Sequence, residues 1–261
     1  MLVLLPPSEG KAAGAKRGAP VDLGRLSLGG LTRARAAVLD ELVELCAADE
    51  DKAADVLGLS PGLRGEIAKN AALLTAPALP AARLYTGVLY DALGLATLEP
   101  AVRRRADRSL LVFSGLWGAL RLSDRVPAYR CSMGVRLPGA GGLAAYWRPF
   151  MDEVLPAEAG TGLVLDLRSS AYAAAWKPRG ALAARTATVR VLQVTVVGGV
   201  EKRTVVSHFN KATKGRLVRA LLESDARPRT PEALAGVLGD LGFTAEQPAP
   251  GRLDILVREL H

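Results

Sequence analysis

Two lysines three residues apart could bind a phosphate in the C-terminal third of the chain. They are Lys211 and Lys214, in the stretch SHFNKATKGRLVR that runs from Ser207 to Arg219. The pattern predicts a strand end, a turn and the first turn of a helix, where backbone amides favour an anion. Residues three apart share one helix face, so both lysines, with Arg216 nearby, are candidate phosphate ligands. Basic residues in a first helical turn are unfavourable because they lie at the positive end of the helix dipole, and a bound phosphate would compensate this positive charge.

A second candidate anion site follows the first buried segment of the chain. Leu2 to Leu5 are all apolar and predict a short buried strand, and Pro6-Pro7 ends it. The next residues, Ser8 to Lys11, form a small-residue loop whose backbone amides and single lysine could receive an anion. The loop is not a P-loop, because the GxxxxGK[ST] pattern is absent. A solvated surface loop is the alternative interpretation.

The third candidate is the stretch FSGLWGALRLSDRVPAYRCSMG, from Phe113 to Gly134, which interleaves glycines, aromatic residues and arginines. A guanidinium group offers a planar fork to phosphate oxygens, and an aromatic ring can stack on a base. The alternative is that Trp117 and Leu120 belong to the core and the arginines form solvated ion pairs. We expect Trp117 in the core and treat three arginines as ligand candidates, Arg121, Arg125 and Arg130.

The distribution of charge favours a polyanionic partner. The formal net charge is +8, with an isoelectric point near 9.8. Between Arg103 and Arg148 there are nine arginines against two aspartates, and between Glu201 and Arg219 six basic residues stand against one acid. Charge that is clustered in this way is typical of nucleic-acid binding. We therefore expect DNA or a nucleotide as the partner.

Cysteine, histidine and hydropathy patterns argue against several other classes. Cys46 and Cys131 lie far apart without metal-ligand spacing, and the two histidines are His208 and His261. We expect no metal site and no cofactor, and two free thiols suit a reducing cytoplasm. His208 could act as a general base, although a lone histidine beside a phenylalanine is more often a packed residue. No apolar run is long enough for a membrane span or signal segment, so we expect a cytoplasmic protein that does not partner with a membrane.

Periodicity predicts a mixed α/β fold built as one domain over residues 1–261. Strands are expected at residues 2–5, 110–113, 163–167, 188–197, 202–207 and 252–257. Helices are expected at residues 32–46, 53–57, 63–74, 82–93, 142–155, 171–176, 211–222 and 234–241, with a surface loop at 10–30. Gly198-Gly199 predicts a hairpin, and Thr32 is the expected cap of the first helix. The glycines of residues 114–121 predict either a tight strand-to-helix turn or a hairpin.

Six blocks of the sequence resemble those of the YaaA family in order and approximate spacing. They are MLVLLPPSEGK, LYTGVLYDALGL, FSGLWGALRLSDRVPAYRCSMGVRL, AYWRPF, LDLRSSAYAAAW and SHFNKATKGRLVR. The resemblance covers nearly the whole chain and marks a divergent, actinobacterial-type member. Divergence lies in the first and last blocks, where the commoner Ser-Pro-Ala-Lys-Thr and Phe-Tyr-Ala-Lys-Lys types are replaced but a lysine is kept.

The resemblance implies a single compact α/β body with a central mixed sheet and a helix-hairpin-helix element. We place that element on residues 113–125, with residues 53–74 as the competing position. It also implies a role in peroxide stress, in limiting damage from intracellular iron, and in binding double-stranded or distorted DNA through a basic cleft.

Three functional hypotheses follow. The first is a DNA-binding protein without enzymatic activity, whose cleft is lined by Lys11, Arg121, Arg125, Arg130, Lys211, Lys214 and Arg216. The second is an enzyme acting on a nucleotide or nucleobase, with catalytic candidates Lys11, Tyr129 and Lys211. The third is a scaffold whose basic patches meet an acidic protein. The first two require residues 8–11, 121–134 and 207–216 to surround one concave surface.

Overall fold

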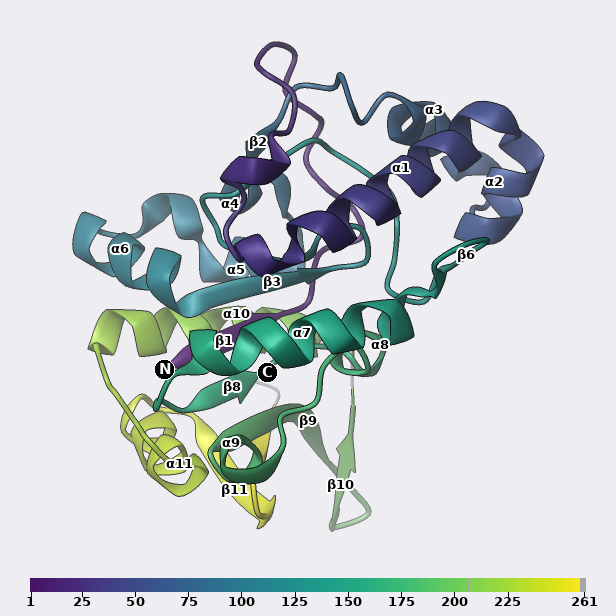
Figure 1. The fold of residues 1–261 in the computed structure, drawn as a ribbon. Coiled ribbons are helices and arrows are strands. Elements are labelled where there is room, and N and C mark those ends of the chain that lie inside the picture. The colour runs from purple at the N-terminus through teal and green to yellow at the C-terminus, as the bar shows by residue number, and fades with distance from the viewer. Residues whose placement is uncertain (206, 259–261) are drawn as a thin grey trace.

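The fold is centred on an eight-stranded mixed sheet. The computed structural model describes residues 1–205 and 207–258 of the chain. The strand order is β11-β12-β9-β8-β1-β3-β4, with β10 paired to β9 (Figure 1). Strands β12, β9, β8, β1 and β3 run parallel, and β11, β4 and β10 are antiparallel to their neighbours. The strands are β1 Leu2–Leu5, β3 Leu110–Ser114, β4 Gly118–Leu120, β8 Val164–Asp166, β9 Thr186–Val197, β10 Val200–Thr204, β11 Thr244–Ala249 and β12 Arg252–Arg258.

Helices surround this sheet, and two small ribbons lie outside it. The described helices are α1 Thr32–Ala48, α2 Glu50–Leu57, α3 Gly65–Ala71, α4 Ala81–Leu84, α5 Val88–Leu93, α6 Pro100–Ser109, α7 Leu143–Ala159, α8 Ser170–Ala173, α9 Gly180–Ala184, α10 Ser207–Ser224 and α11 Pro231–Asp240. The ribbons pair β2 Leu79–Pro80 with β5 Arg125–Val126, and β6 Arg136–Leu137 with β7 Gly141–Gly142. Figure 1 shows α7 crossing in front of β1 and β8.

The middle of the sheet is the core of the molecule. Every residue of β1 and β3 is buried. Parallel strands that are covered on both faces are expected to consist of continuous apolar runs, as these strands largely do. One hydrophobic cluster extends from Leu2 to Ile255 and includes Trp117, Trp147 and Trp176. The prediction of a single compact α/β body with a central mixed sheet is therefore confirmed.

The placement of a helix-hairpin-helix element on residues 113–125 is wrong. This segment forms the antiparallel hairpin of β3 and β4, in which Val112 pairs with Leu120, and it continues into β5. A Cβ atom on Gly115 would lie 2.6 Å from the Ser132 carbonyl carbon, so the turn packs directly against another backbone segment. Gly118 has a φ of +72°, which glycine adopts without the strain of other residues. At the competing position, α2 and α3 are two helices joined by a short connection.

Several element boundaries also differ from expectation. The helix expected at residues 82–93 is divided into α4 and α5, because Gly87 has a φ of +91° and the Thr86 amide donates to Ser8 Oγ instead of continuing the helix. Thr32 begins α1 but makes no capping bond, since a 3-10 turn over Gly29–Leu31 leads directly into the helix. β11 was not expected from the sequence.

Other expectations are confirmed. Strands cover residues 2–5 and 110–113, the β9–β10 hairpin turns at Gly198-Gly199, and Trp117 is fully buried. The side chain of His208 and the whole of His261 lie outside the described part of the chain, so the general-base hypothesis for His208 stays a prediction.

Candidate functional site

The ends of β1 and β8 define the place in the sheet where a ligand is expected. These two parallel strands are neighbours, with Leu4 paired to Asp166, so their carboxyl ends open at the same edge. After β1 the chain proceeds to β3 on one side, and after β8 it proceeds to β9 on the other. Connections that leave neighbouring strands in opposite directions open a crevice, and open α/β sheets bind ligands there.

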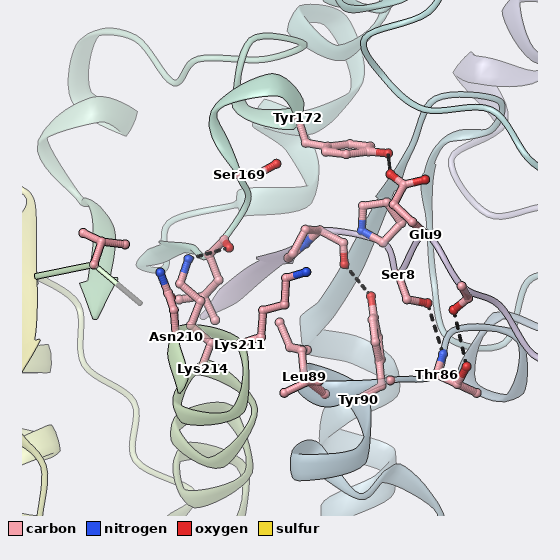
Figure 2. A pocket seen from close by; sticks show the side chains of 17 residues that line it. Ser8, Glu9, Thr86, Leu89, Tyr90, Ser169, Tyr172, Asn210, Lys211 and Lys214 are labelled. Carbon is pink, nitrogen blue, oxygen red and sulfur yellow. Dashed lines mark hydrogen bonds between the residues drawn. The ribbon is translucent and has the colours of Figure 1, made fainter. Parts of the chain in front are cut away.

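A cavity of about 560 Å³ lies at this position (Figure 2). Its volume is in the range of small-molecule sites in proteins. Four segments line it, the loop after β1, the start of α5, the turn after β8 and the start of α10. The lining residues are Pro6, Pro7, Ser8, Glu9, Gly10, Thr86, Gly87, Val88, Leu89, Tyr90, Leu167, Ser169, Tyr172, Val205, Asn210, Lys211 and Lys214.

Two lysines of α10 supply positive charge to the cavity. Lys211 is exposed and extends towards its middle, whereas Lys214 is partly buried and donates from Nζ to the Leu167 carbonyl at 3.1 Å (Figure 2). Burial lowers the pKa of Lys214, and the nearby Asp166 carboxylate opposes this effect. α10 begins at Ser207 and not, as expected, at residue 211, so both lysines lie beyond its first turn, and the anion-binding character of the site comes from their side chains rather than from the helix dipole.

The position of these lysines depends on a glycine. A Cβ atom on Gly215 would lie 2.2 Å from the Leu89 carbonyl oxygen and 2.9 Å from Ala92 Cβ. Only glycine therefore allows α10 to approach α5 this closely. The contact brings Lys211 and Lys214 to the same cavity as the first residues of α5.

The opposite side of the cavity carries a carboxylate. Tyr172 donates from its hydroxyl to Glu9 Oε1 at 3.1 Å, and burial together with the Glu9 charge raises the pKa of Tyr172. The loop that carries Glu9 is fixed at two other points. Ser8 Oγ accepts from the Thr86 amide at 3.1 Å, and Tyr90 donates to the Pro6 carbonyl at 2.6 Å.

Lys11 lies behind this loop, on the side of the core. Its Nζ is 4.1 Å from the centre of the Tyr129 ring and donates to the Ser8 carbonyl at 3.2 Å. Burial lowers the pKa of Lys11 to about 8. Beneath it, Tyr129 shares hydrogen bonds with Ser114 at 2.6 Å and with Tyr85 at 2.8 Å. These hydrogen bonds hold the Tyr129 side chain in the core, and burial raises the pKa of its hydroxyl.

Arg130 is the member of the arginine block that reaches the cavity wall. Its guanidinium donates to the Glu9 carbonyl at 3.1 Å. Its backbone is held by the fully buried Asn70, which accepts from the Arg130 amide at 2.9 Å and donates to the Arg130 carbonyl at 2.8 Å. A cation is therefore placed directly behind the loop that carries Glu9.

The remaining cations bind protein groups elsewhere. Arg121 pairs with Glu158 and donates to the Arg108 carbonyl at 2.6 Å. The Arg125 guanidinium donates to the Ala78 carbonyl at 2.8 Å, and Arg216 reaches Thr213 Oγ1 at 3.5 Å. The structure thus brings the loop of residues 8–11 and the start of α10 together, and joins Arg130 to them. It does not bring Arg121, Arg125 or Arg216 into the cavity lining.

Five polar residues of the cavity were not named as site residues from the sequence: Glu9, Thr86, Ser169, Tyr172 and Asn210. Glu9 and Asn210 do lie within the candidate stretches 8–11 and 207–219. A signal for Ser169 and Tyr172 was available, because they follow a predicted buried strand, and the carboxyl ends of parallel strands meet at one edge of a sheet. No comparable signal existed for Thr86, which reaches the site through the break between α4 and α5.

A second cavity, of about 390 Å³, lies beside β8 and the start of β9. Its lining includes Arg168, which donates to both carboxylate oxygens of Asp166 at 2.8 and 2.6 Å. The guanidinium also stacks 4.2 Å from the Phe113 ring. Because Arg168 is fully engaged and buried, its role is to hold the turn after β8.

Two further properties of the described chain concern metal ions and membranes. Among the side chains that the structure describes, which do not include that of His208, no three His, Cys, Asp or Glu side chains gather in a way that could hold a metal ion. None of the helices described in the structure has the length and apolar character needed to span a bilayer.

Comparison with known proteins places the chain in a family. The sequence profile described as Peroxide stress protein YaaA matches residues 1–248. The chain belongs to the YaaA family. A UPF0246 protein of Streptomyces coelicolor is 65% identical over the full length of both chains. A UPF0246 protein of Corynebacterium efficiens is 42% identical over 94% of this chain and 95% of its own, and one of Ruegeria sp. is 32% identical over 82% and 87%. The identities place this YaaA-family chain near the actinobacterial relatives.

Proposed function

We propose that the chain serves the peroxide stress response by binding nucleic acid, and that it does so through phosphate contacts around the cavity at the ends of β1 and β8. The observation that carries this proposal is the meeting of Lys211 and Lys214 with the loop of residues 8–11 at this edge of the sheet. The family description supplies the link to peroxide stress.

The state of the lysines supports a phosphate ligand. Lys211 has no hydrogen bond or ion pair to another group of the described chain, so its ammonium is free to bind a ligand. Lys214 bonds to a neutral carbonyl and not to a carboxylate, so its charge is not cancelled by direct pairing. Charge-assisted hydrogen bonds to phosphate are roughly twice as strong as neutral ones, and these two groups could each make one.

A second function is favoured by the size of the cavity. Specific protein–DNA interfaces bury about 1,000–2,500 Å² of protein surface, so a duplex would contact only the rim of a cavity of 560 Å³. That volume suits a nucleotide or nucleobase. The Glu9 carboxylate, the Tyr172 hydroxyl and the Lys211 ammonium could contact such a ligand within the cavity, and Lys11 lies behind the same loop. An enzyme acting on a nucleotide or nucleobase is therefore the second candidate.

A binding assay separates the two functions. The anisotropy of a short labelled duplex is titrated with the wild-type protein, and the Lys211→Ala variant is compared with it. Loss of one charged hydrogen bond should weaken duplex binding about tenfold, which corresponds to about 1.4 kcal/mol. Arg229→Ala is the matched control, because it removes one exposed cation from the connection between α10 and α11.

The outcomes discriminate clearly. Duplex binding that Lys211→Ala weakens and Arg229→Ala leaves intact supports the nucleic-acid function. No duplex binding by the wild type contradicts it, and binding of a mononucleotide in that case makes the enzyme the leading candidate.

A further inference from the structure

The cavity has opposite charge at its two ends. Lys214 and Asn210 lie at one end, with Lys211 reaching towards the middle, and Glu9 and Tyr172 lie at the other (Figure 2). A site that bound only phosphate would gain nothing from a carboxylate, because like charges repel. The arrangement fits a ligand with an anionic group at one end and hydrogen-bond donors at the other.

Between the charged ends the lining is largely apolar. Pro6, Pro7, Leu89, Tyr90 and Tyr172 contribute flat or aliphatic surfaces. The Tyr90 hydroxyl is bonded to the Pro6 carbonyl, which fixes the edge of its ring. Walls of this kind suit a planar, aromatic ligand body, since a base can stack on any flat apolar or aromatic face.

We infer that the cavity holds one nucleotide, with its phosphate at Lys211 and Lys214 and the edge of its base donating hydrogen bonds to Glu9. This inference rests on the proposed nucleic-acid or nucleotide function, and it specifies that the cavity recognises the base as well as the phosphate. It assigns Glu9 as the residue that selects the base. Tyr172 is a positioning residue, because its hydroxyl holds one oxygen of Glu9.

The carboxylate predicts which base binds best. An ionised carboxylate accepts hydrogen bonds but donates none. Guanine offers two adjacent donors on its Watson–Crick edge, from N1 and the exocyclic amino group, and can satisfy both carboxylate oxygens. Adenine offers one donor beside an acceptor nitrogen, which the carboxylate repels. A guanine nucleotide is therefore preferred over an adenine nucleotide.

The same nucleotide chemistry could come from two sources. One is a free mononucleotide, and the other is an unpaired nucleotide of a DNA strand that turns out of the base stack. A fully paired guanine cannot enter, because its Watson–Crick edge is occupied by cytosine.

The decisive variant is Glu9→Gln, which keeps the size of the side chain and removes its charge. Calorimetric titration with GMP and AMP should show that the wild type binds GMP at least tenfold more tightly. Glu9→Gln should lower this preference to less than threefold, mainly by weakening the binding of GMP. Tyr172→Phe, which releases Glu9, should reduce the preference in part. Glu44→Gln on the exposed face of α1 is the matched control and should retain it.

The source of the nucleotide is resolved with two labelled duplexes, one fully paired and one carrying a single unpaired guanine. Tighter binding of the second, lost in Glu9→Gln, identifies DNA as the source. Equal binding of both duplexes with a GMP preference identifies the free nucleotide.

Failure of the inference is distinguishable from failure of the proposed function. A wild type that binds duplex in a Lys211-dependent manner, but shows no base preference or one unaffected by Glu9→Gln, overturns the inference and leaves the function standing. A protein that binds neither duplex nor mononucleotide overturns both. Circular dichroism of each variant establishes that it is folded.

Discussion

At the scale of the residue, Lys211 and Glu9 of the cavity are exposed, but some side chains behind its wall are held away from solvent. Lys11 is the clearest case, because burial lowers its pKa to about 8 while it packs on the Tyr129 ring. The stretch of residues 8–11 could be recognised from the sequence as a candidate anion loop. The sequence could not indicate that Lys11 turns towards the core, since that depends on the distant residues Ser114, Tyr129 and Tyr85.

Lys11 should make the stability of the protein depend on pH. Its pKa is about 8 in the fold and about 10.4 in the unfolded chain, so the unfolded state binds more protons between these values. The free energy of unfolding should therefore rise as pH increases from 8 to 10.4, and the cost of burying the charge is fully present below pH 8.

Lys11→Met tests this dependence, since it should stabilise the protein by about 1–2 kcal/mol at pH 7 and abolish the Lys11 contribution to the rise. Urea denaturation at pH 7 and pH 9.5 measures both effects. A variant that is less stable than the wild type at pH 7 would show that the interactions of the Lys11 cation stabilise the fold by more than the burial of its charge costs.

The cysteines lead to a second prediction at this scale. Cys131 is buried, and burial raises the pKa of its thiol to about 12. The thiolate is the form that reacts with peroxide, so the Cys131 thiol should be inert at pH 7 in the folded protein. Mass spectrometry after peroxide treatment should find Cys131 unmodified in buffer and oxidised in denaturant. Rapid oxidation of the folded protein would identify Cys131 as a peroxide sensor and contradict this account.

At the scale of the element, the buried strands were the easiest to predict. The apolar runs of β1 and β3 and the Gly-Gly turn of β9–β10 are local signals that the fold preserves. β11 escaped prediction because Thr244–Ala249 is polar, contains a proline and lies at the edge of the sheet, where its pairing with β12 decides its structure. The β3–β4 hairpin was one of two structures expected for residues 114–121, but the helix-hairpin-helix element was wrongly placed there, because the packing of Gly115 against residues 131 and 132 is not local.

The approach of α10 to α5 gives a prediction at the scale of the element. Gly215→Ala places a methyl group 2.2 Å from the Leu89 carbonyl oxygen and should destabilise the protein by about 2–3 kcal/mol or displace α10. Either effect should weaken ligand binding, because Lys211 and Lys214 move with the helix. Thermal unfolding and the duplex titration measure the two consequences.

The control for this prediction is Gly236→Ala in α11, where an added methyl group meets no atom within 4 Å. It should be neutral or stabilising by up to about 1 kcal/mol, because alanine has the higher helix propensity. Equal effects of the two substitutions would show that the contact between α10 and α5 does not position the lysines.

At the scale of the whole molecule, the cavity exists because distant segments meet at one edge of the sheet. The loop after β1, the turn after β8 and the start of α10 span some two hundred residues of sequence, yet they line one space. Clustered charge in the sequence indicated cations without indicating which of them converge. The structure separates Lys211, Lys214 and Arg130, which lie at or behind the cavity wall, from Arg121 and Arg125, which bind protein groups elsewhere.

The measurement that tests the central claim most directly is the dependence of duplex affinity on salt concentration for the wild type, Lys211→Ala, Lys214→Ala and Arg229→Ala. If phosphates are bound at the cavity, the logarithm of the affinity should fall linearly with the logarithm of the salt concentration, by about 0.9 per phosphate neutralised. Lys211→Ala and Lys214→Ala should each reduce the slope by about one unit, and Arg229→Ala should leave it unchanged. A wild-type affinity that does not vary with salt, or a slope that neither lysine variant alters, would contradict phosphate binding at this site.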